Sequence, residues 1–237
     1  MPVIVFASPK GGAGKTTSAF VLATEVASKG VRTAIIDADP NHPIENWQKR
    51  GGNAENLTIL KNDDEDLILD DIDHAKKNFD FVIVDLEGTA NLAVAYAISR
   101  ADLVIIPSQR SSLDAGEAAK AVALVKRQSS VAGRVIHFSL LLTRTSAAIR
   151  TKGLKRMMQN IESRAIDIFE TEIIDREAFK AIFDHTKTLY QLSPSQVSGL
   201  ESARSNAESF AYEVINKLKT NLQNNLETVN KHDAYAS

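Results

Sequence analysis

The fold of this chain is decided by the stretch Val3-Ile4-Val5-Phe6-Ala7-Ser8-Pro9-Lys10-Gly11-Gly12-Ala13-Gly14-Lys15-Thr16-Thr17. An apolar run predicts a buried strand, the glycines predict a turn, and a helix is expected to begin near Lys15. Glycines allow successive backbone N–H groups to curl around phosphate oxygens, and the helix N-terminus adds the positive end of its dipole. The stretch therefore predicts a phosphate-binding loop, with Lys15 on the β- and γ-phosphates and the Thr16 hydroxyl on Mg²⁺.

Two simpler interpretations of the loop are possible. It could be a glycine-rich turn between a strand and a helix, with a solvated lysine. A dinucleotide-binding turn, G-x-G-x-x-G, would need glycine where Thr16 or Thr17 stands and has no use for Lys15. The usual phosphate loop begins with a glycine, whereas this chain has Pro9 at that position and an additional lysine, Lys10, beside it.

Composition restricts the class of protein. The 237 residues are 43% hydrophobic and 24% charged, which is typical of a globular α/β domain. The absence of cysteine excludes disulfides and thiolate metal sites, and it is compatible with a reducing cytoplasm. A net charge of −2 gives no general attraction to nucleic acid, so DNA contact would need a local basic patch. We see no signal peptide and no apolar run of the ~20 residues that span a bilayer.

Hydrophobic patterning predicts a parallel sheet. A helix that ends at Gly30 lies between the first strand and the next apolar run, which makes a βαβ unit. We expect further helices, including a final one from about residue 199 to 224 or beyond, with Phe210, Val214, Leu218 and Leu222 in one row. Strands are predicted at 3–6, 33–36, 57–60, 79–84, 103–106 (ended by Pro107), 135–142 and 166–174.

Aspartates follow two of these strands. Asp37 and Asp39 follow one strand, and Asp85 follows another, at the edge where ligands bind in open α/β sheets. Carboxylates next to a phosphate loop suit Mg²⁺ binding and the positioning of water. The alternative is that Asp37 or Asp39 only caps the turn that follows it.

Charge clusters elsewhere have two interpretations each. The acidic stretch from Asp63 to Asp73 fits a solvated helix, with an apolar stripe that includes Leu67, better than a metal site. A basic stretch could follow a phosphate backbone or be a solvated helix face. The candidate DNA-binding residues in it are Arg150, Lys152, Lys155, Arg156 and Arg164.

The loop, the Asp37-Ala38-Asp39-Pro40 segment and Asp85 together resemble the ParA/MinD superfamily of deviant Walker ATPases. Pro9 and Lys10, which depart from the usual phosphate loop, match the signature of that superfamily. Within it, the chain is similar to the small plasmid-partition ParA proteins and to the VirC-type ATPases of DNA transfer. The resemblance implies an α/β fold: a single P-loop NTPase domain over residues 1–230, with a mostly parallel twisted sheet, helices on both faces, a C-terminal helix and a frayed tail at 231–237.

The resemblance also implies a mechanism. ATP and Mg²⁺ are the expected cofactors, and the ATP-bound chain would form a homodimer in which Lys10 reaches the partner's phosphates. Lys15 would act on the phosphates and Asp39 would orient the attacking water, while Thr16, Asp37 and Asp85 support the metal. The implied nucleotide contacts are Lys10, Gly11, Gly12, Ala13, Gly14, Lys15, Thr16 and Thr17, with base contacts near Thr143, Arg144, Asp175 and Arg176.

The implied output is DNA partition. Relatives bind DNA non-specifically as ATP dimers and hydrolyse ATP slowly until a ParB-like or other DNA-bound partner stimulates them, in the cytoplasm on the nucleoid. A VirC-type accessory role in DNA transfer is one alternative. A MinD-like membrane switch is another, but the narrow apolar row of the last helix favours packing and no stable membrane association. A metabolic ligase with the same loop would not need Lys10 across a dimer. The presence of Glu87 after Asp85, where relatives carry prolines, is a departure.

Overall fold

The computed structural model describes residues 1–8, 11–87, 92–109, 115–146 and 166–235. Seven parallel strands form one sheet in the order β3-β2-β4-β1-β5-β6-β7. Helices cover both faces, so the predicted α/β fold is confirmed. The strands are β1 Val3–Phe6, β2 Thr33–Ala38, β3 Leu57–Lys61, β4 Phe81–Leu86, β5 Leu103–Gln109, β6 His137–Thr145 and β7 Ile173–Ile174.

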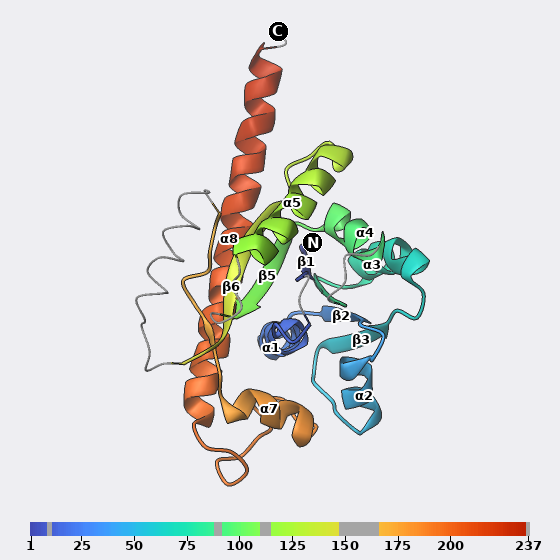
Figure 1. The fold of residues 1–237 in the computed structure, drawn as a ribbon. Coiled ribbons are helices and arrows are strands. Elements are labelled where there is room, and N and C mark those ends of the chain that lie inside the picture. The colour runs from blue at the N-terminus through green and yellow to red at the C-terminus, as the bar shows by residue number, and fades with distance from the viewer. Residues whose placement is uncertain (9–10, 88–91, 110–114, 147–165, 236–237) are drawn as a thin grey trace.

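The helices divide into two layers (Figure 1). Successive strand residues alternate between the faces, since Ile4 and Phe6 pack on one layer while Val3 and Val5 pack on the other. The first layer contains α1 Lys15–Ser28, α2 Pro43–Lys49, α7 Glu177–Asp184 and α8 Leu200–Tyr235. The second contains α3 Ile68–Asn78, preceded by the 3₁₀ turn η1 Glu65–Leu67, with α4 Leu92–Arg100 and α5 Ala115–Ala132.

The last helix, α8, extends beyond the sheet and the helices that pack around it. Phe210 and Val214 are fully buried, as the predicted apolar row requires, but Leu222 is 62% exposed. Figure 1 shows α8 continuing beyond the other elements. The helix reaches Tyr235, which agrees with the expected end at residue 224 or beyond.

Two local predictions, on an apolar stripe and on the end of a strand, are wrong. Leu67 is 49% exposed and does not join the apolar face of α3. Pro107 does not end β5, which continues to Gln109. The carbonyl of Ile105 accepts from the N–H of Ala7, so the backbone of Ile105 faces β1. The backbone of Pro107, two residues later, faces the same way, but β1 has already ended there, so the missing N–H of the proline costs no hydrogen bond of the sheet.

The expected strand 166–174 is mostly absent. Only Ile173–Ile174 forms β7, with a single bridge between Ile168 and Leu140. Side chains of α8 replace the missing ladder: Glu213 accepts from the N–H groups of Glu170 and Thr171, at 2.8 Å each. Apolar patterning could not reveal this, because the bonds come from a helix distant in sequence.

Trp47 fixes the position of α2. Its ring is fully buried, meets Phe20 edge-on at 4.8 Å between centroids, and donates from Nε1 to the carbonyl of Ile182. Gly52 lies against this ring, and a Cβ on Gly52 would come within 2.6 Å of three ring atoms.

Gly52→Ala is therefore expected to lower the free energy of unfolding by about 2 kcal/mol, because an overpacked buried ring must shift. Urea unfolding of the variant measures this. Gly11→Ala is the control, since a Cβ there meets open space. Equal stability of the two variants would show that the ring moves without cost.

Candidate nucleotide site

The glycine-rich loop connects β1 to α1 at the carboxyl edge of the sheet. Gly12 and Gly14 have φ values of 74° and 87°, in the left-handed region that favours glycine. The first helical bond runs from the N–H of Ser18 to the carbonyl of Gly14, at 3.0 Å. The helix therefore begins at Lys15, as predicted.

Two neighbouring strands hold this loop by its carbonyl groups. Gln109 donates from Nε2 to the carbonyl of Gly12, and Thr143 donates from Oγ1 to that of Ala13, at 2.7 Å each. Within the described part of the chain, the N–H groups of Gly11, Gly12 and Ala13 donate no hydrogen bond. Amides with no described acceptor, at the start of a helix, are what an anion-binding loop requires.

Gln109 is a supporting residue that the sequence did not reveal. It lies at the end of β5, beyond the proline at which the strand was expected to stop. If the predicted strand ran to residue 109, Gln109 would stand at the carboxyl end of a strand, where ligand-site residues are expected in such sheets. Thr143 is a predicted base contact, and its buried hydroxyl also supports the loop.

Thr143→Val is expected to lower the free energy of unfolding by about 1–2 kcal/mol, since the shape is kept but the Ala13 carbonyl loses its donor. Chemical unfolding measures the stability, and calorimetric titration should show that the variant binds nucleotide more weakly than the wild type. Thr58→Val, at an exposed position of β3, is the matched control. A variant as stable as the wild type would contradict a supporting role for the hydroxyl.

Two fully buried carboxylates lie beside the loop. Asp37 of β2 and Asp85 of β4 are paired in register on neighbouring strands. Neither oxygen of Asp85 has a hydrogen bond of ordinary geometry, although the nearby Thr16 hydroxyl opposes the rise in its pKa. Burial nevertheless raises the pKa of Asp85 to about 7.

Asp37 at the end of β2 and Asp39 just after it do cap the following turn, as the alternative interpretation holds. Asp37 accepts through Oδ2 from the N–H groups of Ile44 and Glu45, at 2.9 and 2.8 Å. Asp39 accepts through Oδ1 from the N–H and side-chain amide of Asn41. The other oxygen of Asp37, Oδ1, is buried without a partner, and burial raises the pKa of this carboxyl. Capping thus occupies only part of each carboxylate.

Lys15 is 7% exposed and faces this acidic group. Burial lowers its pKa, while the charges of Asp85, Asp39 and Glu87 oppose the change in that order. One cation thus lies among several carboxylates beside amides that an anion can use. The site is electrostatically arranged for a phosphate with a divalent cation.

The donor set fits Mg²⁺ only in combination with a phosphate. No group of three or more His, Asp or Glu side chains within the described residues could hold a metal alone. However, the unpartnered oxygens of Asp37 and Asp85, next to the Thr16 hydroxyl, fit a cation that also takes phosphate and water oxygens.

A cavity of about 250 Å³ adjoins the loop. It brings together all four predicted base contacts, Thr143, Arg144, Asp175 and Arg176, with Gly14 and Thr17 of the loop. The Nε of Arg176 is buried without a hydrogen-bond partner. The sequence did not identify the remaining wall of this cavity, which α7 supplies through Phe179, Lys180, Phe183 and Asp184.

Some predicted residues lie outside the described parts of the chain. They are Lys10 and the DNA-binding candidates Arg150, Lys152, Lys155, Arg156 and Arg164. No helix among the described residues is long and apolar enough to cross a membrane.

The sequence profile of the family described as VirC1 protein matches residues 1–228. The chain belongs to the VirC1 family. It is also 37% identical over 218 residues to the protein ParA of Rhizobium radiobacter, covering 92% of this chain and 98% of that protein. The protein virC1 of Rhizobium radiobacter is 27% identical over 187 residues, with 77% and 80% coverage. These matches confirm the resemblance to ParA and VirC-type proteins.

A solved structure has the same fold. A variant of McdA from Cyanothece, in complex with ATP, aligns with a TM-score of 0.70 at 17% identity, covering 90% of this chain and 96% of that one. The likeness extends through the sheet and its helices and so supports the assigned architecture.

Proposed function

We propose that this VirC1-family chain is a ParA-type ATPase that dimerises on ATP, binds DNA without sequence preference and hydrolyses ATP slowly to drive plasmid or chromosome partition. The observation that carries the proposal is Lys15, buried among Asp85, Asp39 and Glu87 beside loop amides that lack described acceptors. The relative ParA and the ATP complex of the McdA variant support it.

Each residue has a role in the proposal. Bound Mg²⁺ and ATP supply the γ-phosphoryl group and a metal charge that stabilises it. The amides of residues 11–17 hold the phosphates, and Lys15 neutralises their charge. Thr16, Asp37 and Asp85 would hold the metal, while Asp39 would orient the attacking water through the carboxylate oxygen that Asn41 does not occupy.

The base would occupy the cavity beside Thr143 and Arg176. Arg176 Nε is a buried donor without a partner, and a nucleotide could accept from it. We further propose that residues 1–230 form one domain and that the chain works in the cytoplasm on the nucleoid, with no stable membrane association. Its stimulating partner would be a ParB-like or another DNA-bound protein.

DNA binding that requires ATP tests the output. Binding to two unrelated duplexes should appear with ATP, be weak with ADP, and fall steeply between about 50 and 200 mM salt, because neutralised phosphates release counterions. Replacing Lys155 and Arg156 by glutamate should remove it, while Lys49→Glu, at an exposed lysine of α2, should not. Equal binding with ATP, ADP and no nucleotide would contradict the proposal.

Dimerisation tests the role of Lys10. Lys10→Ala should leave a monomer in the presence of ATP, as measured by light scattering, whereas the wild type forms a dimer. Unchanged behaviour would favour a metabolic ligase, which has no need of a lysine across an interface.

A second candidate is a VirC-type accessory ATPase of DNA transfer, which the match to the VirC1 family favours. Both functions use the same nucleotide site, so the discriminating observation is the cargo. Crosslinking in cells would recover plasmid centromere DNA with a partition ATPase and transfer-origin DNA with a transfer accessory.

A further inference from the structure

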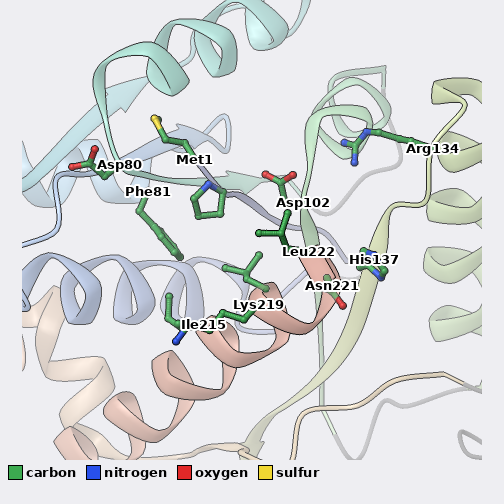
Figure 2. A pocket seen from close by; sticks show the side chains of 12 residues that line it. Met1, Asp80, Phe81, Asp102, Arg134, His137, Ile215, Lys219, Asn221 and Leu222 are labelled. Atoms are coloured by element: carbon green, nitrogen blue, oxygen red, sulfur yellow. The ribbon is translucent and has the colours of Figure 1, made fainter. Parts of the chain in front are cut away.

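A second hollow lies at the opposite edge of the sheet from the nucleotide site. It has a volume of about 370 Å³ and is bordered by the amino ends of β1, β4, β5 and β6 and by the middle of α8. Figure 2 shows Phe81 and Asp102 on the side of the sheet, with Ile215, Lys219 and Leu222 on α8. Because parallel strands all run the same way, this edge is a full strand length from the loop.

The hollow has an apolar interior. Phe81 is 3% exposed, and Ile215 and Leu218 are half-buried against the core. Leu222 is 62% exposed at the rim, although it belongs to the same apolar row. An apolar ligand in the hollow would therefore remove Leu222 from water.

The acidic groups of the lining already have partners. Asp102 accepts through Oδ2 from the N–H of Val3, at 2.8 Å. Asp80 accepts through both oxygens from the guanidinium of Arg32, at 2.8 Å each. The Arg32 guanidinium therefore neutralises Asp80, whereas the backbone N–H of Val3 leaves the negative charge of Asp102 in place.

Two cations of the lining, Arg134 and Lys219, have no acidic partner among the described residues. Arg134 donates from Nη2 to the carbonyls of Ser99 and Ala101, at 2.9 and 2.7 Å, which fixes the guanidinium without neutralising it. Lys219 forms no hydrogen bond or ion pair with any described residue, whereas Lys217, two residues before it in α8, is paired with Asp167. The hollow therefore combines an apolar interior with a net positive rim, since Arg134 and Lys219 outnumber Asp102, the one lining carboxylate without a cationic partner among the described residues.

We propose that this hollow binds a small amphipathic carboxylate. The apolar part of the ligand packs on Phe81, Ile215 and Leu222, and its carboxylate lies at the rim beside Lys219 and Arg134. The volume is within the range of small-molecule sites, about 300–1,000 Å³. This inference does not depend on the proposed ATPase function.

Titration of the full chain with octanoate tests the proposal, with amide chemical shifts followed by NMR. We expect saturable shifts at the residues of the hollow, weaker affinity for octanol, and no binding of octylamine, whose charge is opposite. Lys219→Gln should weaken octanoate about threefold and leave octanol unchanged, since a rim charge pair contributes little more.

Leu222→Gln removes the apolar rim and should weaken both octanoate and octanol about tenfold. It changes an exposed side chain, so the fold is kept. Tyr212→Gln, at a 70% exposed position of the same helix, and Lys49→Gln, at a lysine of α2, are the matched controls and should change neither affinity. Absence of saturable shifts, shifts centred elsewhere, equal binding of octylamine, or indifference to Leu222→Gln would each overturn the proposal.

Discussion

Lys15→Met is expected to reduce ATP hydrolysis by at least about a hundredfold and to weaken ATP binding. Lys15 is the first residue of α1, directly after the loop, and the charges of Asp85, Asp39 and Glu87 act on it. Without its charge, an anionic phosphate would face carboxylates alone. Removing a group that stabilises developing charge costs about 10²–10³ in rate. Phosphate release measures hydrolysis, and calorimetric titration measures binding.

Methionine keeps most of the length of the side chain, so the buried space stays filled. The control is Lys126→Met, at an exposed lysine of α5 outside the site, which should leave hydrolysis within about twofold of wild type. Circular dichroism should show both variants folded. A folded Lys15→Met protein that hydrolyses ATP at close to the wild-type rate would remove the basis of the proposed site.

The sequence predicted the parts of the fold that depend on local patterns. The continuous burial of Val3–Phe6, the left-handed glycine Gly14 and the aspartate near the end of β4 each have a local signature in the sequence, and the structure has all three. A sequence specifies its fold most clearly where several such local signals agree with one another. The structure adds the order of the strands and, with it, the pairing of Asp37 with Asp85 on neighbouring strands.

The sequence could not predict features that depend on distant partners. Pro107 remains within β5 because β1 ends beside it, and Gln109 then reaches Gly12 from the extended strand. Segment 166–174 reads as a strand, yet α8 satisfies part of its backbone through Glu213.

Asp37 shows a further limit of the sequence. The sequence allows two roles for Asp37, capping the next turn or supporting a metal. In the structure its two oxygens differ: Oδ2 accepts from the N–H groups at the start of α2, and Oδ1 has no hydrogen-bond partner. A pattern of residue types cannot separate the two oxygens of one carboxylate.

The metal-free protein is expected to lose stability as the pH rises from about 4 to 7. Burial raises the pKa of Asp85 from its ordinary value of 3.8 to about 7, so the folded state keeps a proton that the unfolded state releases in this interval. The stabilisation is complete below pH 3.8 and is lost as the pH rises through 7, by about 4 kcal/mol in all. Burial shifts the pKa of Asp37 in the same direction. Urea unfolding in EDTA at several pH values measures the slope.

Asp85→Asn isolates the contribution of this carboxylate, because the amide has the same shape and does not titrate. The variant should be more stable than wild type at pH 8, by about 2–4 kcal/mol, and similar to it near pH 4. It should also lose ATP hydrolysis, since the wild type tolerates a buried charge that the metal would need. Glu55→Gln, at an exposed carboxylate before β3, should change neither property. If Asp85→Asn followed the wild-type pH slope, Asp85 would be ionised in the folded state and neutralised by Lys15, and the acidic group beside the loop would already be paired before any nucleotide binds.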